Sequence, residues 1–502
     1  MCRISGVSMM GMIFVFIYKE ENMMIKRRFV TRIAACVLAG IMAMQMTGCG
    51  SKKVDYSLDG ESSDESGSSD DNGKSTLAKT LGVPDKCDET FDVGKSGLSE
   101  IRCTADPIDV PDSEQMKKVY YTTAKLDSER IQSIVEGLLD RSKGIYVRKD
   151  GVSTKDELKS MIENTKKFKE EAKSQGDDTS DAWYDSQIES YEKQMAEAPD
   201  TLPPLENYDD PYGAYTGKYG DKDYTVAITM YSGNDYVDAG MYMAFSQAET
   251  EENKLLDGVS GATYTYVTGV SNATDVDVTN MTNECRITEN DAISQAMNFL
   301  SGVGIDGMEC TDVEPLVRIW ASENGDVKKS EVNGYYVSMS RTINGVPIRS
   351  DELYNVDNLQ NQNGYMYDTN DIAHVCVNDE GIVYMYTSLY SDSASFKDED
   401  VDILNWSDMI SKANESIAAY YEKYQTRYGR IDFNKAELRY VAAVDDSGKK
   451  CFIPAWVFTQ SEELRGGDTS AEISQIICIN AMDGSYIDLV ENAKKMKLWQ
   501  DF

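Results

Sequence analysis

The C-terminal half of the chain repeats one pattern, in which a capped amphipathic helix is followed by strand-like runs and a glycine hairpin. The first helical pattern opens with a cap at Thr288, and the second begins at Ser407. Both copies close on a turn in which Gly381 or Gly484 supplies a residue that adopts positive φ without strain. The recurrence predicts two structural copies, each with one helix on an antiparallel sheet.

Three strand-like segments of the first copy correspond to segments of the second. The hairpins match best, because Val-Cys-Val-Asn precedes one turn and Ile-Cys-Ile-Asn precedes the other. The first copy is longer by an Asn-rich insert near 355–370. The corresponding segments are 315–320 with 437–444, 335–341 with 452–458, and 375–384 with 477–486.

The region before the repeat carries both helical and strand patterns. A strand-like run at 118–124 leads to a helix that Asp127 or Ser128 can cap. From Thr154 onward apolar residues recur at helical spacing, and a second amphipathic helix follows a polar break at 174–178. These features predict a helical hairpin, whose aromatic residues we interpret as packing. Alternating runs then predict strands up to the start of the repeat.

The N-terminal segment has the three parts of a secretory signal. Basic residues at 26–28 and 32 are followed by a short apolar stretch at 33–44, and small residues then lead to Cys49. The apolar stretch is shorter than the roughly 20 residues that a bilayer requires, so a transmembrane anchor is the weaker interpretation. Thr-Gly-Cys resembles a lipobox, in which the cysteine is lipidated and becomes the new N-terminus, although Met46 replaces the usual leucine. An ordinary cleaved signal is the alternative.

Lipidation of Cys49 would hold the folded part of the chain at the membrane surface. Two acyl chains give stable attachment, because each buried methylene contributes about 0.8 kcal/mol. The following residues, 50–76, are rich in Ser, Gly, Asp and Glu, so we expect a disordered, charge-extended tether. A signal of conventional length would start at Met23 or Met24. The sequence therefore predicts a protein anchored at the outer face of the cytoplasmic membrane.

The composition is strongly acidic, with 86 Asp and Glu against 50 Lys and Arg, and a net charge of −36. Nucleic acid binding requires clustered basic side chains, so we expect no nucleic acid partner. The same charge disfavours a surface that lies flat on anionic lipid. A solvated, self-repelling surface accounts for the acidity, and a basic partner is the alternative.

Seven of the ten cysteines remain when Cys2, Cys36 and the lipidated Cys49 are set aside. Seven is an odd number, and no CxxC pair occurs. Cys376 and Cys478 lie in apolar runs, where we expect buried free thiols. Cys87 and Cys103 form the better candidate for a disulfide, which the compartment outside the cytoplasm allows.

The sequence offers no pattern for catalysis or for metal binding. The one histidine, His374, would have to serve any Ser-His or Cys-His mechanism, and no nucleophile elbow accompanies it. We interpret it as a strand-edge residue. Zinc-ligand clusters, glycine-rich phosphate loops and the 12-residue calcium loop are missing from the sequence. Carboxylate pairs can hydrolyse glycosides, but so many acidic residues single out no pair. We therefore predict no catalytic residue, metal or cofactor.

The 31 tyrosines support a second hypothesis, because exposed aromatic side chains bind sugars. Most of these tyrosines alternate along predicted strands. Half-buried packing on a sheet accounts for that arrangement.

The repeated units resemble known modules. A helix, then antiparallel strands that close on Ile-Asn-Ala-Met-Asp-Gly at 479–484, resembles the PepSY-type module of protease propeptides and secreted regulatory lipoproteins. The segment 341–348 is similar to one in YycH/YycI-type extracellular regulators of a cell-wall sensor kinase. The exported chain resembles uncharacterised lipoproteins of low-GC Gram-positive gut bacteria that share a domain of unknown function. The module resemblance covers 290–490 and implies protein binding or inhibition outside the membrane, with no catalytic residues.

These observations predict an α+β fold, with an N-terminal mixed domain that contains a helical hairpin, followed by two PepSY-like modules. The predicted function is that of a non-catalytic, lipid-anchored regulator or adaptor that binds another envelope protein. A solute- or glycan-binding lipoprotein is the second hypothesis, although such receptors usually show βαβ alternation; a carboxylate hydrolase is the third. The predicted segments are 1–48 (signal peptide), 49–76 (lipidated cysteine and tether), 77–112 (irregular), 113–283 (N-terminal domain), 284–395 (first module) and 400–495 (second module).

Overall fold

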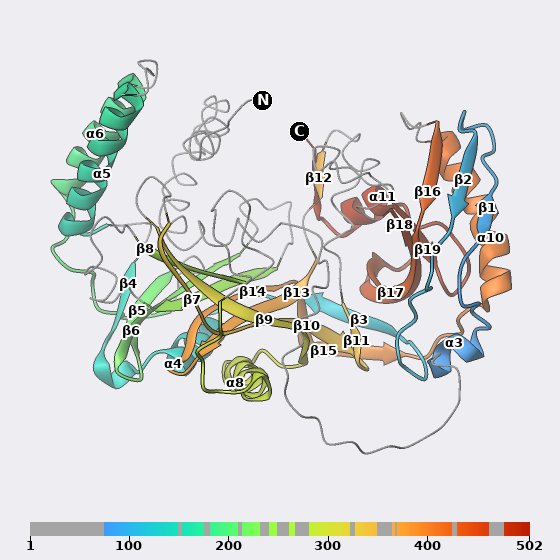
Figure 1. Cartoon of the computed structure of the whole chain (residues 1–502), viewed down its shortest axis with the longest axis horizontal. Helices are drawn as coiled ribbons and strands as arrows, with labels where there is room; N and C mark the ends of the chain where they lie inside the picture. Colours follow the sequence, from blue (N-terminus) through green and yellow to red (C-terminus); the bar gives the residue numbers. More distant parts are fainter. Residues whose placement is uncertain are drawn as a thin grey trace.

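The chain folds as a mixed α+β protein with large antiparallel sheets, as the sequence predicts. Figure 1 shows the largest sheet at the centre and left, and a second sheet with its helices at the right. The predicted signal peptide and Cys49 lie outside the described residues. The computed structural model describes residues 75–148, 153–174, 181–208, 213–230, 240–247, 261–266, 281–321, 327–348, 364–366, 369–423, 429–460 and 476–501.

The largest sheet has ten strands in the order β4-β5-β6-β7-β14-β13-β10-β9-β8, and the short β11 pairs with β10. Neighbouring strands are antiparallel throughout. The strands are β4 (Ile145–Arg148), β5 (Ala214–Tyr219), β6 (Lys222–Met230), β7 (Met241–Gln247), β8 (Gly261–Tyr266), β9 (Met308–Ala321), β10 (Val327–Ile343), β11 (Val346–Pro347), β13 (Asp371–Asn378) and β14 (Gly381–Leu389).

A second sheet has five strands, in the order β15-β3-β18-β17, with β19 also paired to β18. Two smaller sheets lie beside it: β1-β2-β16, in which β16 runs parallel to β2, and the pair β12-β20. The strands are β1 (Glu89–Phe91), β2 (Glu100–Cys103), β3 (Lys118–Thr123), β12 (Gly364–Met366), β15 (Ser391–Glu399), β16 (Arg430–Phe433), β17 (Lys435–Val444), β18 (Lys450–Thr459), β19 (Ile476–Asn480) and β20 (Trp499–Asp501).

The helices begin where the sequence supplies caps. Asp127 caps α4 by accepting a hydrogen bond from the Arg130 backbone N–H, and Thr288 forms a capping box with Asp291 at α8. The helices are α3 (Thr76–Thr80), α4 (Ser128–Leu138), the 3₁₀ turn η1 (Arg141–Lys143), α5 (Lys155–Ser174), α6 (Asp181–Met195), α8 (Glu289–Gly302), α10 (Trp406–Lys423) and α11 (Leu489–Lys495). None of these helices is long and apolar enough to cross a membrane.

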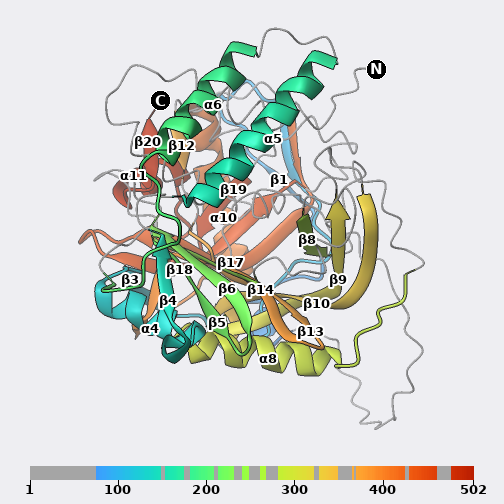
Figure 2. The same cartoon turned by 90° about the vertical axis from the view of Figure 1, so that its left-hand side faces the viewer.

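One face of the ten-stranded sheet is covered by α4 and α8 (Figure 2). Apolar side chains spaced by helical turns, such as Ile134 on α4 and Ala296 on α8, pack on alternate residues of the strands, including Val337 and Val375. Removal of this apolar area from water contributes about 25 cal/mol per Å² to stability.

The five-stranded sheet packs against α10 and α11 in a separate core. Trp456 of β18 is fully buried there, and its ring lies 4.9 Å from the ring of Trp406 at the start of α10. Helix α10 begins one residue before the predicted Ser407, because the Asn405 side chain accepts a hydrogen bond from the Asp408 backbone N–H and caps the helix.

The two copies of the sequence repeat share a helix and three paired strands. Helix α8 precedes β9, β10 and β13, with β11 and β12 inserted before β13, and α10 precedes β17, β18 and β19, with β16 inserted before β17. The middle strand pairs with both others in each set. The Asn378 side chain accepts a hydrogen bond from the Glu380 N–H, and Asn480 accepts one from the Met482 N–H. The turn at 379–380 leads into β14, which begins at Gly381, whereas the hairpin of the second copy makes a single bridge, Ile479 to Tyr486.

One predicted correspondence between the copies is displaced. Tyr336 lies opposite Cys376, and the equivalent neighbour of Cys478 is Val457, whereas alignment of the segments by sequence pairs Tyr336 with Ile453. Apolar residues fill almost every position of β18, so the sequence pattern gives no register for that strand.

The predicted boundary near residue 283 does not separate two sheets. Strand β7 from the N-terminal region pairs with β14 of the first module, and β8 pairs with β9. Strand β3 likewise lies between β15 and β18. The segment 77–112, predicted to be irregular, contains α3, β1 and β2. Those strands are only three and four residues long, and β2 pairs with β16, far away in the sequence, so they leave no local periodicity.

The predicted helical hairpin consists of α5 and α6, which project from the body of the protein (Figure 1). Lys169 forms an ion pair with Asp185, and Lys173 forms one with Asp181, so the end of α5 is joined to the first part of α6. Buried residues on α5 include Leu158, whereas α6 has no fully buried side chain. The hairpin is therefore a thin arm.

Candidate functional site: an aromatic sheet face and the junction beside it

The two faces of the ten-stranded sheet differ in chemistry. Along β13, Ala373 and Val375 face the core formed with α8, and the intervening residues His374 and Cys376 face the other side. Among the described helices, only α4 and α8 belong to the core on the sheet's apolar face (Figure 2). We call the opposite face, which carries His374, the aromatic face.

Five rings form a continuous row on the aromatic face. They belong to β7, β14, β13, β10 and β8, so the row crosses the centre of the sheet. The distances between successive ring centroids are 4.5, 6.1, 5.3 and 4.8 Å. The rings in order are Tyr242, Tyr386, His374, Tyr336 and Tyr266. Tyr336 is fully buried beneath its neighbours, and the others are half-buried.

Uncharged polar groups accompany the rings. Residues that lie directly opposite each other on successive strands form two rows across the sheet. The first row has a hydroxyl-bearing residue at each end. The second row is displaced by two residues along the strands and contains His374. The first row is Thr216, Thr225, Ser246, Tyr384, Cys376 and Tyr336. The second is Ala227, Ala244, Tyr386, His374 and Ser338. On β9 the first row continues with Glu314 and the second with Asp312, so each row ends beside an acidic residue.

One polar atom of the aromatic face is unsatisfied. The Tyr384 side chain is 2% exposed, and its hydroxyl has no hydrogen-bond partner in the described part of the chain. A buried hydroxyl without a partner carries a desolvation cost.

His374 does not lie at a strand edge as the sequence suggested. It belongs to β13, which has a strand on each side, because the distant β10 pairs with it. Its Nδ1 atom lies 3.2 Å from the Ser338 hydroxyl on the neighbouring strand. Burial lowers the pKa of His374 to about 4, so the imidazole is neutral near pH 7.

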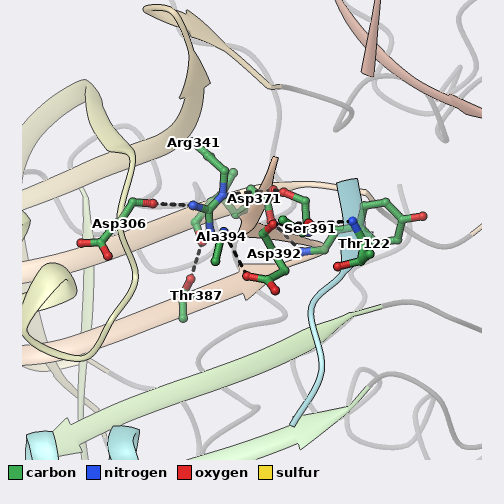
Figure 3. A network of polar contacts seen from close by, with 11 residues as sticks. Thr122, Asp306, Arg341, Asp371, Thr387, Ser391, Asp392 and Ala394 are labelled. Carbon is green, nitrogen blue, oxygen red and sulfur yellow. Dashed lines mark hydrogen bonds and ion pairs between the residues drawn. The ribbon is translucent and has the colours of Figure 1, made fainter. Parts of the chain in front are cut away.

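The second feature is the junction where the chain passes between the two large sheets. Strand β14 ends at Leu389, and β15 begins in the other sheet at Ser391. The carboxylate of Asp371 holds this crossing, because it accepts hydrogen bonds from the backbone N–H groups of Tyr390 at 2.6 Å and Ser391 at 3.0 Å and from the Ser391 hydroxyl (Figure 3).

Arg341 completes the junction from β10. Its Nε lies 3.3 Å from Oδ2 of Asp371, and its Nη1 donates to the carbonyl oxygen of Asp306 (Figure 3). Burial raises the pKa of Asp371, and the positive charge of Arg341 together with the hydrogen bonds from Ser391 and Tyr390 opposes that rise.

Two further connections meet the same crossing. The Ala124 N–H, at the end of β3, donates to the carbonyl oxygen of Tyr390. Beyond Arg341, Ile348 forms a parallel bridge with Tyr440 of β17. The two sheets are thus joined at three places within one buried network.

The described cysteines are all free thiols. Cys376 and Cys478 are fully buried in strands, as predicted. The predicted disulfide between Cys87 and Cys103 is not formed; instead, the two buried thiols are hydrogen-bonded to each other. That hydrogen bond raises the pKa of Cys87 and lowers the pKa of Cys103.

The predicted site residues have mixed outcomes. Cys49, the predicted lipidation site, lies outside the described residues, and no binding residue was predicted. The part of the chain that the structure describes holds no group of three or more His, Cys, Asp and Glu side chains arranged for a metal ion. Sequence reasoning missed both the ring row and the Arg341–Asp371 pair. Alternate tyrosines at 384 and 386 were a usable signal, but the neighbouring strands come from distant segments.

Comparison with known proteins adds little. No protein-family model matches the chain, and no curated protein sequence matches it. Among solved structures, the chain is similar to an uncharacterized protein from Eubacterium rectale, with 11% sequence identity, coverage of 82% of this chain and 98% of that one, and a TM-score of 0.34. A likeness at this TM-score gives no basis for transferring a function.

Proposed function

We propose that the chain is a non-catalytic extracytoplasmic lipoprotein, anchored through Cys49, that binds another envelope protein as a regulator or adaptor. The signal-like segment with its Thr-Gly-Cys sequence supports the anchor. The two segments that each combine one helix with three antiparallel strands support the PepSY-like interpretation, and therefore protein binding outside the membrane.

The observation that carries the proposal is the buried pair of Arg341 and Asp371 at the junction. Solute receptors commonly enclose a ligand by closing two lobes around a hinge. Here the crossing between the sheets is fixed by a carboxylate that is fully buried and by an arginine side chain that is 3% exposed. A rigid scaffold fits a protein that presents a preformed surface to a partner better than it fits a receptor that closes.

The polar pair Ser338 and His374 gives weak support to an enzyme. The Ser338 hydroxyl lies beside Nδ1 on the neighbouring strand, and no carboxylate is hydrogen-bonded to the imidazole among the described residues. A pKa of about 4 makes this histidine a poor general base at neutral pH. These features favour binding over hydrolysis.

The test is cross-linking in intact cells, followed by affinity capture of the full-length chain from membranes. We expect the wild-type chain to capture one envelope protein reproducibly. The matched control is Cys49→Ala, which leaves the folded part unchanged. We expect this variant to be released from the membrane fraction or to remain unprocessed. The released form should lose the in-cell cross-link, yet bind the captured partner when both are mixed in solution.

Two results would contradict the proposal. In the first, the wild-type chain cross-links to no envelope protein although it is folded and present in membranes. In the second, the Cys49→Ala variant mixed with the captured partner fails to bind it, which would show that the folded part is not the contacting surface.

A further inference from the structure

Strand β15 forms an open edge of the second sheet. It pairs with β3 alone, and in the described part of the chain no other segment forms a backbone-to-backbone hydrogen bond with residues 392–400. The outward N–H and C=O groups of an edge strand stay available for pairing with another strand. We call the outer side of residues 392–399 the β15 edge.

Other outer strands are covered by the chain itself. At β17, the Leu438 N–H donates to the carbonyl oxygen of Asp109, whose own N–H donates to Ala436. At β4, the Leu205 N–H donates to the carbonyl oxygen of Ile145. The hairpin after β19 folds back on that strand in the same way. Such covers prevent pairing with other chains, and among the described segments none covers β15.

The β15 edge is held firmly in place. Phe396 packs on the core of the second sheet. The Ser395 hydroxyl accepts a hydrogen bond from the Thr122 N–H at 2.8 Å, within the bulge that residues 393–396 form against β3. The regularly paired part of the edge is 397–399. A strand that is already ordered binds without the entropic cost of ordering it.

Acidic side chains line this edge. The segment 392–402 contains five acidic residues and one basic residue. Lys117 forms ion pairs with Asp398 and Asp400, whose side chains nevertheless remain 47% and 85% exposed. When Lys117 and Lys118 are counted with the segment, acidic residues still outnumber basic ones by five to three. The edge therefore keeps an excess of negative charge.

This charge decides which strand the edge accepts. A second copy of the chain would place the same carboxylates opposite each other, and it carries a net charge of −36, so repulsion opposes self-pairing. A strand with Lys or Arg side chains would instead form cross-strand ion pairs. The same carboxylates thus reject one class of strand and attract the other.

We propose that the β15 edge binds an extended, Lys- or Arg-rich segment of another protein, which adds to the second sheet as an antiparallel strand beside residues 397–399. Backbone hydrogen bonds would hold the added strand, and the carboxylates would select its basic side chains. This inference rests on the proposed function and supplies the contact surface and the chemistry of the envelope partner.

The first experiment uses three blocked peptides of equal length. One alternates Lys and Val, and the second has the same sequence with every backbone nitrogen methylated. These two carry the same charge, but the second has no N–H group for strand pairing. The third alternates Glu and Val. Binding to the full chain, purified from cells, is measured by fluorescence anisotropy, and hydrogen exchange with mass spectrometry locates the contact.

We expect only the unmethylated Lys-Val peptide to bind saturably, with an affinity that falls as salt rises from about 50 mM to about 500 mM. Bound peptide should slow hydrogen exchange in 391–402 and leave the exchange of α6 unchanged. Glu399→Lys should weaken binding about threefold to tenfold, because an attraction at an exposed position becomes a repulsion.

The matched control is Glu189→Lys. Glu189 is also exposed but lies on the projecting arm, and its replacement changes the net charge of the chain by the same amount. This variant should change peptide affinity less than about twofold. Equal weakening by Glu399→Lys and Glu189→Lys would show that the whole charge of the chain, and not the β15 edge, attracts the peptide, and would overturn the inference.

The envelope partner captured by the wild-type chain separates this inference from the proposed function. We expect that partner to slow exchange in 391–402, and Glu399→Lys to capture less of it. A partner that is captured equally by Glu399→Lys, and that leaves exchange in 391–402 unchanged, would overturn the inference and leave the proposed function standing. Peptide binding at the β15 edge without any captured envelope protein would contradict the proposed function alone.

Three peptide results also overturn the inference. In the first, the methylated peptide binds as tightly as the unmethylated one, which would mean charge attraction without strand pairing. In the second, the Glu-Val peptide binds as tightly as the Lys-Val peptide. In the third, the Lys-Val peptide fails to bind at millimolar concentration or leaves exchange in 391–402 unchanged, which would make the acidic edge a device that only prevents pairing.

Discussion

The guanidinium of Arg341 and the carboxylate of Asp371 form a buried ion pair, with Nε 3.3 Å from Oδ2, at the place where the chain passes from one large sheet to the other. The same carboxylate accepts the backbone N–H groups of Tyr390 and Ser391. One pair of side chains thus fixes the end of β14, the start of β15 and the end of β10 in one arrangement. The relative arrangement of the two sheets at this crossing depends on the pair.

Replacement of either Arg341 or Asp371 alone should destabilise the protein, because the charge of the other residue stays buried without its partner. We predict that Asp371→Asn and Arg341→Met each lower the free energy of unfolding by about 3–5 kcal/mol, measured by urea denaturation. The double variant should lose clearly less free energy of unfolding than the two single variants together, because it leaves no buried charge unpaired. Additive losses would mean that the two side chains do not interact as the structure has them.

His374 makes a prediction about pH. Its folded-state pKa is about 4, below the value near 6.5 expected in the unfolded chain. Protons therefore bind the unfolded chain first as the pH falls, so this residue contributes stability that is present above about pH 6.5 and is lost on acidification toward pH 4. Because His374 is the one histidine, its imidazole gives a single signal in an NMR spectrum, which should titrate near pH 4.

The control for that prediction is His374→Gln. The stability advantage of the wild type over this variant should shrink between pH 7 and pH 4.5, in matched urea denaturation curves. A His374 signal that titrates near pH 6.5 would show that the imidazole is solvated, and the ring row would then be differently built.

The thiols of Cys87 and Cys103 are placed to form a disulfide in an oxidising compartment. We predict that mild oxidation links them and raises the free energy of unfolding by about 3 kcal/mol, because the link closes a short loop in the unfolded chain. Peptide mapping without reduction detects the link. Cys376 and Cys478 should resist alkylation until the protein unfolds, since both are fully buried. Alkylation of Cys87 and Cys103 in the oxidised protein would refute the pairing.

Gly240 packs directly against the junction. It has a φ of +82°, and a Cβ atom there would lie 2.4 Å from the carbonyl oxygen of Leu389. Gly82 has a φ of +65° but open space around it, so it is the matched control. We predict that Gly82→Ala costs roughly 1–2 kcal/mol for the backbone alone. Gly240→Ala should cost about 1–3 kcal/mol more because backbone atoms must move. Equal losses in thermal or urea unfolding would contradict the close approach.

Local elements were predictable because their signals are local. The cap at Asp127, the capping box at Thr288 and the glycine turn at Gly381 each act on residues within one turn of themselves. The α5–α6 hairpin follows from helical spacing and a polar break. For these elements, sequence pattern and structure agree.

Pairing between distant segments was not predictable from the sequence pattern. Strand β7 pairs with β14, although more than a hundred residues separate them, and no feature of either sequence specifies the other strand as its neighbour. The aromatic face depends on these pairings: Tyr242 approaches Tyr386 only because β7 and β14 are neighbours. The Arg341–Asp371 pair likewise depends on the way β10 and β13 meet. The residue types and their alternation along each strand can be read from the sequence. The contacts between residues on different strands become visible only in the folded structure.

Export and lipidation of Cys49 underlie the proposed envelope partner and the expected disulfide. Mass spectrometry of the N-terminal peptide of the protein purified from membranes tests this claim most directly. The predicted result is a peptide that begins at Cys49 and carries diacylglycerol, with Cys49→Ala either unprocessed or released from the membrane. A mature peptide that begins at another residue without lipid, or a Cys49→Ala variant that stays in the membrane at its mature mass, would contradict it.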